Sequence, residues 1–294
     1  MTMQKVTRVF DLLTFIQEEH VGKTIFSYKV NNEWTHTSTE AFANAVNELS
    51  LGLLKLGIKK GDTVATISSN RPQWNIVDFA VMQIGGIHVP LYPTLSAADV
   101  TYILNDAEIK IVFAENEALA EKINAVVLQS PSVQSIYTFE LTHAFKHWQS
   151  IALLGDSSDK SLIEQFQSAV LPTDLFTLIY TSGTTGNPKG VMLTHQNLLS
   201  NLFAASPLIP PGAYRSLSFL PLSHIYERII VYMYLSKGTN IYYAESLDKI
   251  AANFLEVKPN MFTTVPRLLE KVYDRIVEKG NGLKGIKRLL FFWA

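Results

Sequence analysis

The chain has 294 residues, of which 47% are hydrophobic and 17% charged, a composition typical of globular proteins and too apolar for a disordered chain. Its 25 Lys and Arg residues and 26 Asp and Glu residues give a net charge of −1, so charge offers no support for nucleic-acid binding. The chain contains no cysteine, which excludes disulfides, thiolate catalysis and Cys-ligated metal centres within it. A reducing cytoplasm is the default location.

We expect no membrane-spanning or exported segment. Residues 1–12 lack the continuous apolar stretch of a secretory signal. Residues 79–98 and 190–214 contain no charged residue and are about long enough to span a bilayer, but each contains several prolines, which would break a spanning helix. We interpret the first stretch as a buried helix, a turn and a buried strand, and the second as a helix followed by a loop, in a soluble protein.

The first half of the sequence alternates helical and strand patterns. Apolar residues recur at helical spacing over 42–56, after a Thr-Ser-Thr start signal, and Gly57 ends this helix. A strand is predicted at 63–68, and Pro72 opens a helix that runs to residue 84. A strand at 87–91, a short helix at 99–104 and a strand at 110–114 follow. Strands separated by helices favour a parallel α/β sheet covered on both faces; the alternative is an α+β arrangement with an antiparallel sheet.

The second half repeats this alternation after a weakly patterned connecting region at 128–170. A strand at 175–180 leads into a Gly-rich loop, which is followed by a helix at 195–205. The remaining predicted elements are strands at 216–220, 239–243 and 261–264 and helices at 223–235, 247–255 and 266–277. No repeat of fixed period is visible.

The loop after the strand at 175–180 is the most informative segment. Residues 178–190 read LIYTSGTTGNPKG, an apolar strand that continues into three glycines, four Ser or Thr residues and Lys189. Glycines let the backbone approach a ligand, successive N–H groups and hydroxyls bind anions, and a lysine contacts phosphate oxygens. The pattern therefore predicts a triphosphate-binding loop; the alternative is a surface hairpin without a ligand.

Two other phosphate-binding motifs do not fit. A Walker A loop needs Gly before the lysine and Ser or Thr after it, whereas Lys189 lies between Pro188 and Gly190. The spacing G-x-G-x-x-G occurs at 280–285, but it follows a predicted helix instead of a strand, so we interpret it as chance.

Residues 180–195, YTSGTTGNPKGVMLTH, closely resemble the signature phosphate loop of the adenylate-forming (AMP-binding) superfamily. Five further segments resemble its long-chain fatty acid–CoA ligase branch, namely NRPQW at 70–74, PLYPTLS at 90–96, YILND at 102–106, LPLSHIYER at 220–228 and VPRLLEK at 265–271. The resemblance implies an α/β fold in which stacked, mostly parallel sheets are covered by helices, as in the large N-terminal domain of such enzymes.

The resemblance also implies a two-step reaction and the residues that serve it. ATP and a fatty acid would give an acyl-adenylate and pyrophosphate, and coenzyme A would then give acyl-CoA and AMP, with Mg²⁺ neutralising the phosphates. The residues that match the ATP-binding motif are Thr181, Ser182, Gly183, Thr184, Thr185, Gly186 and Lys189. His224 matches a histidine near the acyl carboxylate and the adenylate, and we expect contact rather than acid–base work. Its alternative role is structural hydrogen bonding.

Neighbouring charged and basic residues have plainer explanations. For Glu227 and Arg228 we expect ion pairs with neighbouring residues, and His195 should begin a helix. Two explanations fit the basic cluster near the end of the sequence: it is a solvated face, or it is attracted to an anionic membrane surface. The cluster consists of Lys279, Lys284, Lys287 and Arg288. We expect a cytoplasmic protein; attraction of these basic residues to a membrane would add peripheral contact at its inner face.

The end of the sequence suggests a longer protein. Residues 288–294 form an apolar run with three consecutive aromatic residues and no cap, although a docked terminal helix would also explain it. Members of the family are considerably longer, so we expect residues 1–294 to be a partial N-terminal AMP-binding domain. We therefore expect the C-terminal remainder and the small lid domain of the family to lie outside these residues, and we expect little activity from the chain alone. Another acyl- or aryl-CoA ligase and a non-catalytic nucleotide-binding module are the alternative functions.

Overall fold

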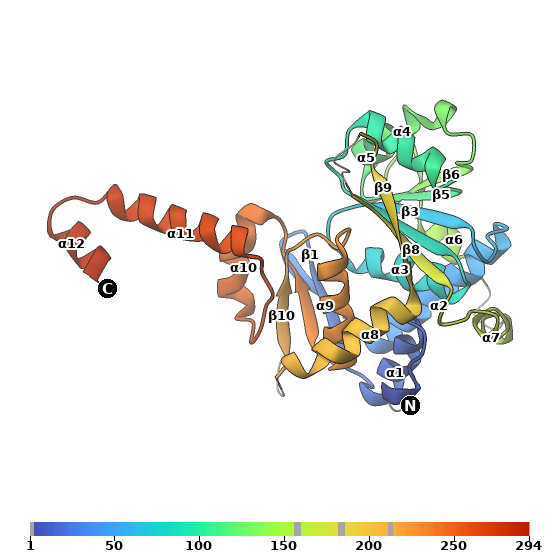
Figure 1. Cartoon of the computed structure of the whole chain (residues 1–294), viewed down its shortest axis with the longest axis horizontal. Helices are drawn as coiled ribbons and strands as arrows, with labels where there is room; N and C mark the ends of the chain where they lie inside the picture. Colours follow the sequence, from blue (N-terminus) through green and yellow to red (C-terminus); the bar gives the residue numbers. More distant parts are fainter. Residues whose placement is uncertain (1–2, 156–159, 182–185, 211–213, 294) are drawn as a thin grey trace. The chain divides into compact units, whose positions relative to one another are not determined.

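A computed structural model describes residues 3–155, 160–181, 186–210 and 214–293 (Figure 1). The chain divides into two compact units, Met1–Met261 and Phe262–Ala294, which we describe separately.

A seven-stranded sheet dominates the first unit, in the order β7-β6-β5-β3-β4-β8-β9. Its strands are β3 (Thr63–Ile67), β4 (Ile87–Leu91), β5 (Ile111–Ala114), β6 (Ser135–Thr138), β7 (Lys146–His147), β8 (Leu175–Thr181) and β9 (Lys189–Thr194). All neighbouring strands are parallel except β8 and β9, which form an antiparallel hairpin at one edge. The predicted, mostly parallel α/β fold is confirmed.

Helices cover both faces of this sheet, so its central strands are buried on both sides. In β5, Ile111 and Phe113 belong to one hydrophobic core, while Val112 and Ala114 belong to another. The second core is completed by α4 (Ala97–Asp106) and α5 (Glu117–Asn124). The first core includes α2 (Thr39–Lys55) and α3 (Pro72–Gln83). Figure 1 shows α4 and α5 beside β5 and β6.

A second, four-stranded sheet has the order β10-β11-β1-β2. Its strands are β1 (Thr24–Val30), β2 (Glu33–Ser38), β10 (Arg215–Ser218) and β11 (Asn240–Tyr243). The pairs β10–β11 and β1–β11 are parallel, and β1–β2 is an antiparallel hairpin. Phe26 of β1 packs in the same core as α2 and α3, so these helices lie between the two sheets.

The remaining elements of this unit are mostly helical. They are α1 (Asp11–Glu19), α6 (Gln149–Ala152), α7 (Lys160–Ser168), α8 (His195–Ala205), α9 (Ile225–Ser236), α10 (Ile250–Val257) and the 3-10 turns η1 (Met3–Lys5), η2 (Val127–Gln129), η3 (Ser206–Leu208) and η4 (Leu247–Lys249). The expected helix at 195–205 is confirmed, and its first residue is His195.

Three sequence predictions need correction. Residues 189–194 form strand β9, whereas we expected residues 190–214 to contain only a helix and a loop. The predicted strand at 261–264 does not form, because only Met261 finds a partner, in a single bridge to Ser216. The connecting region at 128–170 contains ordered elements, of which β6 and β7 extend the large sheet.

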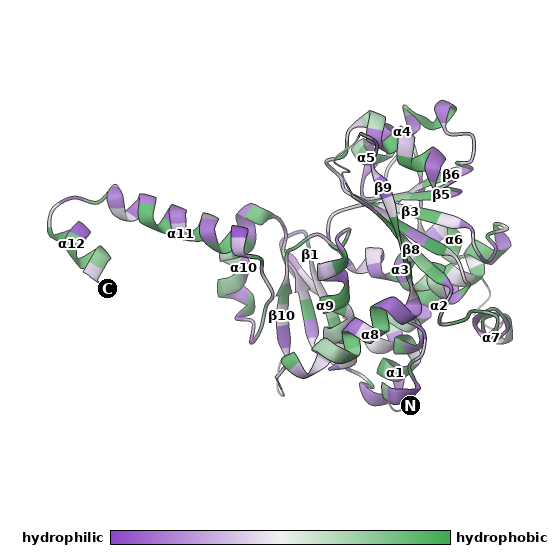
Figure 2. Ribbon diagram, in the orientation of Figure 1, coloured by the Kyte–Doolittle hydropathy of each residue, from purple (hydrophilic) through white to green (hydrophobic). Residues whose placement is uncertain are grey.

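The second unit consists of α11 (Pro266–Asn281) and α12 (Ile286–Trp293). Hydrophilic and hydrophobic residues alternate along α11 (Figure 2). Phe291 of α12 packs against Gly280, where an added Cβ would lie 2.3 Å from its ring. Across the described parts of both units, no helix combines the length and apolarity that a bilayer crossing requires.

Candidate functional site

A cavity of about 990 Å³ lies beside the β8–β9 hairpin. The carboxyl ends of β4 and β8 open onto it, which is where ligands bind in open α/β sheets. Its wall combines apolar and polar side chains from β8, β9, α8, α9 and the segment after β4. The lining residues are Tyr92, Thr94, Leu95, Ser96, Asp99, Ile179, Tyr180, Thr181, Val191, Leu193, Asn197, Leu198, Asn201, His224, Ile225, Tyr226 and Ile229.

The glycine-rich loop connects the two strands of the hairpin at the edge of this cavity. Thr181 is the last residue of β8, lines the cavity and is the register partner of Lys189, the first residue of β9. Lys189 is exposed, and Gly186 has a φ of +113°, which side chains disfavour. Thr181 and Lys189, which we call the hairpin tip, therefore lie next to each other.

Tyr180 fixes the end of β8 that leads into the loop. Its hydroxyl donates to Asp106 Oδ2 at 2.5 Å, and its ring lies over the facing Gly190, where a Cβ would come within 3.0 Å of the ring. Burial, and then the Asp106 carboxylate, raise the pKa of the Tyr180 hydroxyl, so this group stays a donor. This hydrogen bond thus ties the end of β8 to the last residue of α4.

His224 caps the N-terminus of α9 and lines the cavity. Its Nδ1 accepts a hydrogen bond from the backbone N–H of Tyr226 at 3.1 Å. Because Nδ1 is the acceptor, the neutral ring carries its proton on Nε2. His224 can therefore offer Nε2–H as a hydrogen-bond donor from this helix end.

A buried ionic network holds α9 against the large sheet. The Arg228 guanidinium pairs with the Asp78 carboxylate of α3 and donates to Thr177 Oγ1 of β8 at 2.7 Å. His88 contacts the same carboxylate at 2.9 Å, and Tyr232 also donates to it. Burial alone would raise the pKa of Asp78, but the charge of Arg228 and these hydrogen bonds outweigh it and hold the pKa below its ordinary value. The ion pair expected for Arg228 is confirmed.

Glu227, which precedes Arg228, contacts a different strand. Glu227 accepts a hydrogen bond from the Ser218 hydroxyl at 2.6 Å, which connects α9 to the end of β10.

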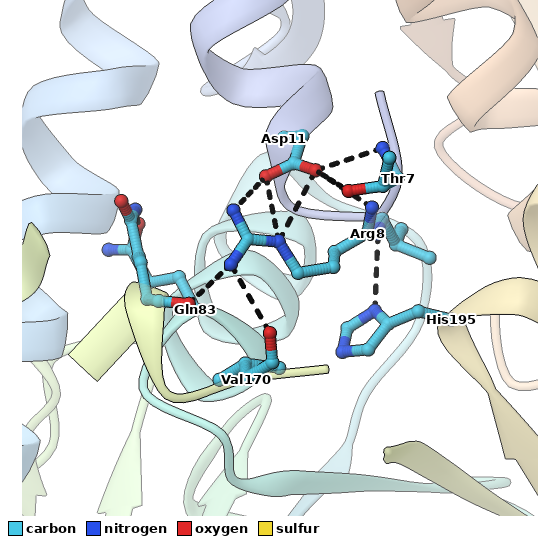
Figure 3. Close-up of polar contacts among 8 residues, drawn as sticks. Thr7, Arg8, Asp11, Gln83, Val170 and His195 are labelled. Carbon is cyan, nitrogen blue, oxygen red and sulfur yellow. Dashed lines mark hydrogen bonds and ion pairs between the residues drawn. The ribbon is translucent and has the colours of Figure 1, made fainter. Parts of the chain in front are cut away.

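A second cluster anchors the base of the hairpin (Figure 3). Arg8 forms a two-point ion pair with Asp11, and its guanidinium also donates to the carbonyl of Val170 at 3.3 Å, just before β8. The backbone N–H of Val9 donates to Nδ1 of His195 at 3.1 Å, directly after β9. The N-terminal segment therefore contacts the chain five residues before β8, at Val170, and directly after β9, at His195.

The predicted site residues fall into three groups. Thr181 and His224 line the same cavity, although 43 positions separate them in the sequence and no spacing pattern relates the two residues. Lys189 belongs to the adjacent hairpin tip, and Gly186 precedes it in the sequence. The loop residues Ser182, Gly183, Thr184 and Thr185 lie outside the described residues.

Sequence reasoning missed several side chains that line the cavity, including Tyr92, Asn197 and Asn201. Tyr92 directly follows a buried strand, so its place at a strand's carboxyl end was an available signal. Asn197 and Asn201 are four residues apart and so share one face of α8, but nothing in the sequence indicates which helix face meets the cavity.

In the described portion of the chain, no three His, Cys, Asp or Glu side chains gather closely enough to hold an ion.

Comparison with known proteins identifies relatives of this chain. It is 31% identical over 253 residues to the long-chain-fatty-acid–CoA ligase FadD15 of Mycobacterium tuberculosis, which covers 85% of this chain and 42% of that protein. It is 31% identical over 291 residues to the peroxisomal long chain acyl-CoA synthetase 7 of Arabidopsis thaliana, covering 95% of this chain and 41% of that protein. The chain thus spans about two fifths of the length of these relatives.

A solved structure supports the fold. A long-chain-fatty-acid–CoA ligase (FadD1) from Archaeoglobus fulgidus matches with a TM-score of 0.78 at 21% identity, covering 92% of this chain and 54% of that one. The model of the family described as AMP-binding enzyme matches residues 15–292, almost the entire sequence. The chain, as its residues 180–195 predicted, belongs to the AMP-binding enzyme family.

Proposed function

We propose that this chain supplies the ATP- and carboxylate-binding part of an AMP-forming fatty acid–CoA ligase. In the first step, a carboxylate oxygen of the acid attacks the α-phosphorus of ATP and pyrophosphate leaves, which gives an acyl-adenylate. In the second, the thiolate of coenzyme A attacks the acyl carbon and AMP leaves. The protein's task in such a reaction is to position the reactants and stabilise their charge.

One observation carries this proposal: Thr181, where the predicted phosphate loop begins, and His224 line a single cavity at the carboxyl ends of β4 and β8. Thr181 and Lys189 pair where the loop begins and ends, so hydroxyl, backbone N–H and ammonium donors come from one hairpin tip. The phosphates of ATP would bind there. The apolar part of the cavity, which includes Ile179, Leu198 and Ile229, would take the hydrocarbon of the acid.

His224 would bind the reacting carboxylate or the adenylate formed from it. Its Nε2–H can donate a hydrogen bond, since Nδ1 already accepts the Tyr226 N–H. A donor of this kind stabilises negative oxygen without accepting its proton. The geometry therefore favours contact over general-base catalysis.

Mg²⁺ and coenzyme A complete the proposed set of ligands. Mg²⁺ would neutralise charge on the ATP phosphates, held mainly by phosphate oxygens and water. The proposed location is the cytoplasm, with peripheral contact at the inner membrane face through the basic residues near α12, which are Lys279, Lys284, Lys287 and Arg288.

Substitution of Lys189 tests the nucleotide site. Lys189→Ala should weaken the affinity of the chain for ATP by about 1–3 kcal/mol, or about 5- to 150-fold, as expected for a hydrogen bond to a charged group. Isothermal titration of the 294-residue chain with ATP and Mg²⁺ measures this change.

Lys237→Ala is the matched control. Lys237 is exposed at the other end of α9, about 20 Å from His224 at the rise of an α-helix, so this variant loses the same charge outside the site. It should bind ATP like the unmodified chain. Equal losses in both variants, or an unchanged affinity in Lys189→Ala, would remove Lys189 from the site.

Titration of the ATP-bound chain with different acids separates the alternative functions. Binding of dodecanoate but not benzoate supports a fatty acid ligase, and the reverse preference indicates an aryl-CoA ligase. ATP binding without affinity for either acid would indicate a non-catalytic nucleotide-binding module.

A further inference from the structure

Asn70 lies after β3 of the large sheet and reaches the turn that carries His224. Its Nδ2 donates to the carbonyl of Leu220 at 2.7 Å and to the Ser218 hydroxyl at 3.2 Å. Its Oδ1 accepts the backbone N–H of Leu222 at 2.9 Å. One side chain therefore binds the last residue of β10 and two residues of the turn that connects β10 to α9.

This turn determines where α9 begins. The backbone N–H of His224 donates to the carbonyl of Pro221 at 2.9 Å, so His224 is part of the same turn. The Ser223 hydroxyl donates to the carbonyl of Leu91 at 3.2 Å, next to the cavity residue Tyr92. Asn70 and Ser223 thus fasten the turn to the carboxyl ends of β3 and β4.

The contacts of Asn70 join the two sheets at the cavity. Its backbone follows β3 of the seven-stranded sheet, while its partners lie at the end of β10 of the four-stranded sheet and in the turn after it. Backbone groups of a turn need partners, and a side-chain amide can serve a donor and an acceptor at once. An apolar residue at this position would leave the Leu222 N–H and the Leu220 carbonyl without the partners seen here.

We propose that Asn70 is a positioning residue that sets the location and the ring tautomer of His224 at the cavity. Asn70 does not itself contact the substrate; it holds the turn so that the Tyr226 N–H meets Nδ1 of His224 and Nε2–H remains available to a ligand. The consequence for ligand binding rests on the proposed function, in which His224 contacts the acid or its adenylate.

Nitrogen NMR of the histidine side chains in the 294-residue chain tests this role. In the unmodified chain, His224 should show the fixed Nε2–H tautomer, because its Nδ1 accepts the Tyr226 N–H. In Asn70→Ala, the His224 signals should move toward the average of two tautomers. Dodecanoate binding to the ATP-bound chain should weaken about fivefold, the equivalent of one net hydrogen bond.

Asn105→Ala is the matched control. The Asn105 amide also makes three side-chain contacts, to the carbonyls of Thr101 and Gln129 at 2.9 Å and to the Ser130 hydroxyl at 3.3 Å. It should lower the melting temperature about as much as Asn70→Ala, but leave the His224 signals and dodecanoate binding unchanged. If Asn70→Ala does not fold, Asn70→Asp replaces it. This variant keeps the acceptor for the Leu222 N–H but loses the amide donors to Leu220 and Ser218, and the same two measurements, with the same expected changes, apply to it.

The two readouts separate this proposal from the function on which it rests. An Asn70→Ala chain whose His224 signals match those of the unmodified chain would overturn the positioning role. His224→Ala with undiminished dodecanoate affinity would instead contradict the function proposed for His224, while the tautomer measurement would still decide the role of Asn70.

Discussion

His195 provides a prediction about stability and pH. Its side chain is 1% exposed and stacks on Phe176 with ring centres 5.2 Å apart. Its Nδ1 accepts the Val9 N–H, the contact drawn at His195 in Figure 3. A protonated ring would lose this acceptor and place a charge in the core. The substitution His195→Asn removes the titrating group and keeps an oxygen near the position of Nδ1.

The size of the effect follows from the pKa of His195. Burial lowers this pKa from 6.5 to about 4, with the nearby Asp11 opposing the shift and Arg8 adding to it. Since the folded-state pKa is depressed, the unfolded chain binds more protons between these values, and stability falls as the pH falls. The difference between the two pKa values corresponds to about 3 kcal/mol of unfolding free energy, at about 1.4 kcal/mol for each pKa unit.

Urea unfolding between pH 7 and pH 4, followed by circular dichroism, measures the difference. The unmodified chain should lose about 3 kcal/mol more unfolding free energy over this range than His195→Asn. His88, whose pKa is also lowered by burial, is present in both proteins, so its contribution cancels. Identical pH slopes for the two proteins would refute the argument.

Two further predictions concern packing. Arg228→Met leaves the fully buried Asp78 carboxylate without its cation and should lower the free energy of unfolding in urea by about 3–5 kcal/mol. The control Lys60→Met removes a more exposed ion pair and should lower it by at most about 1 kcal/mol. Similar losses in both would contradict the buried network. Gly52→Ala places a Cβ 2.0 Å from the carbonyl oxygen of Ile151 and should cost about 1–3 kcal/mol in thermal melts; an unchanged melting temperature would show that α2 and α6 are not in close contact.

The elements that the sequence predicted well are those whose pattern has one physical explanation. The strand at 63–67 and the helix at 72–83 are buried almost throughout, and a turn and Pro72 mark their beginnings. By contrast, β1 and β2 were not predicted: β2 has no fully buried side chain, and in β1 burial is confined to residues 25–27, so neither strand shows an alternation of buried and exposed residues. A turn signal was present there: Asn31 and Asn32 both adopt positive φ, as the tight hairpin turns favoured by asparagine require.

The candidate site was predictable in its chemistry and not in its shape. The loop composition indicated a phosphate site, but β9 escaped prediction because it is an edge strand with several exposed residues. Whether the chain after the loop turns back along β8 depends on long-range contacts, such as that of Val9 with His195. The partners of Asn70 are likewise about 150 residues away in the sequence, beyond the reach of local patterns.

Residue-resolved NMR during titration with ATP and Mg²⁺ tests the central claim most directly. Backbone amide signals of the 294-residue chain should shift saturably at Thr181, Gly186, Lys189 and His224, with little change at the far end of α9. Shifts that cluster away from the hairpin tip and the cavity, or no saturable shift at all, would contradict the claim that ATP binds there.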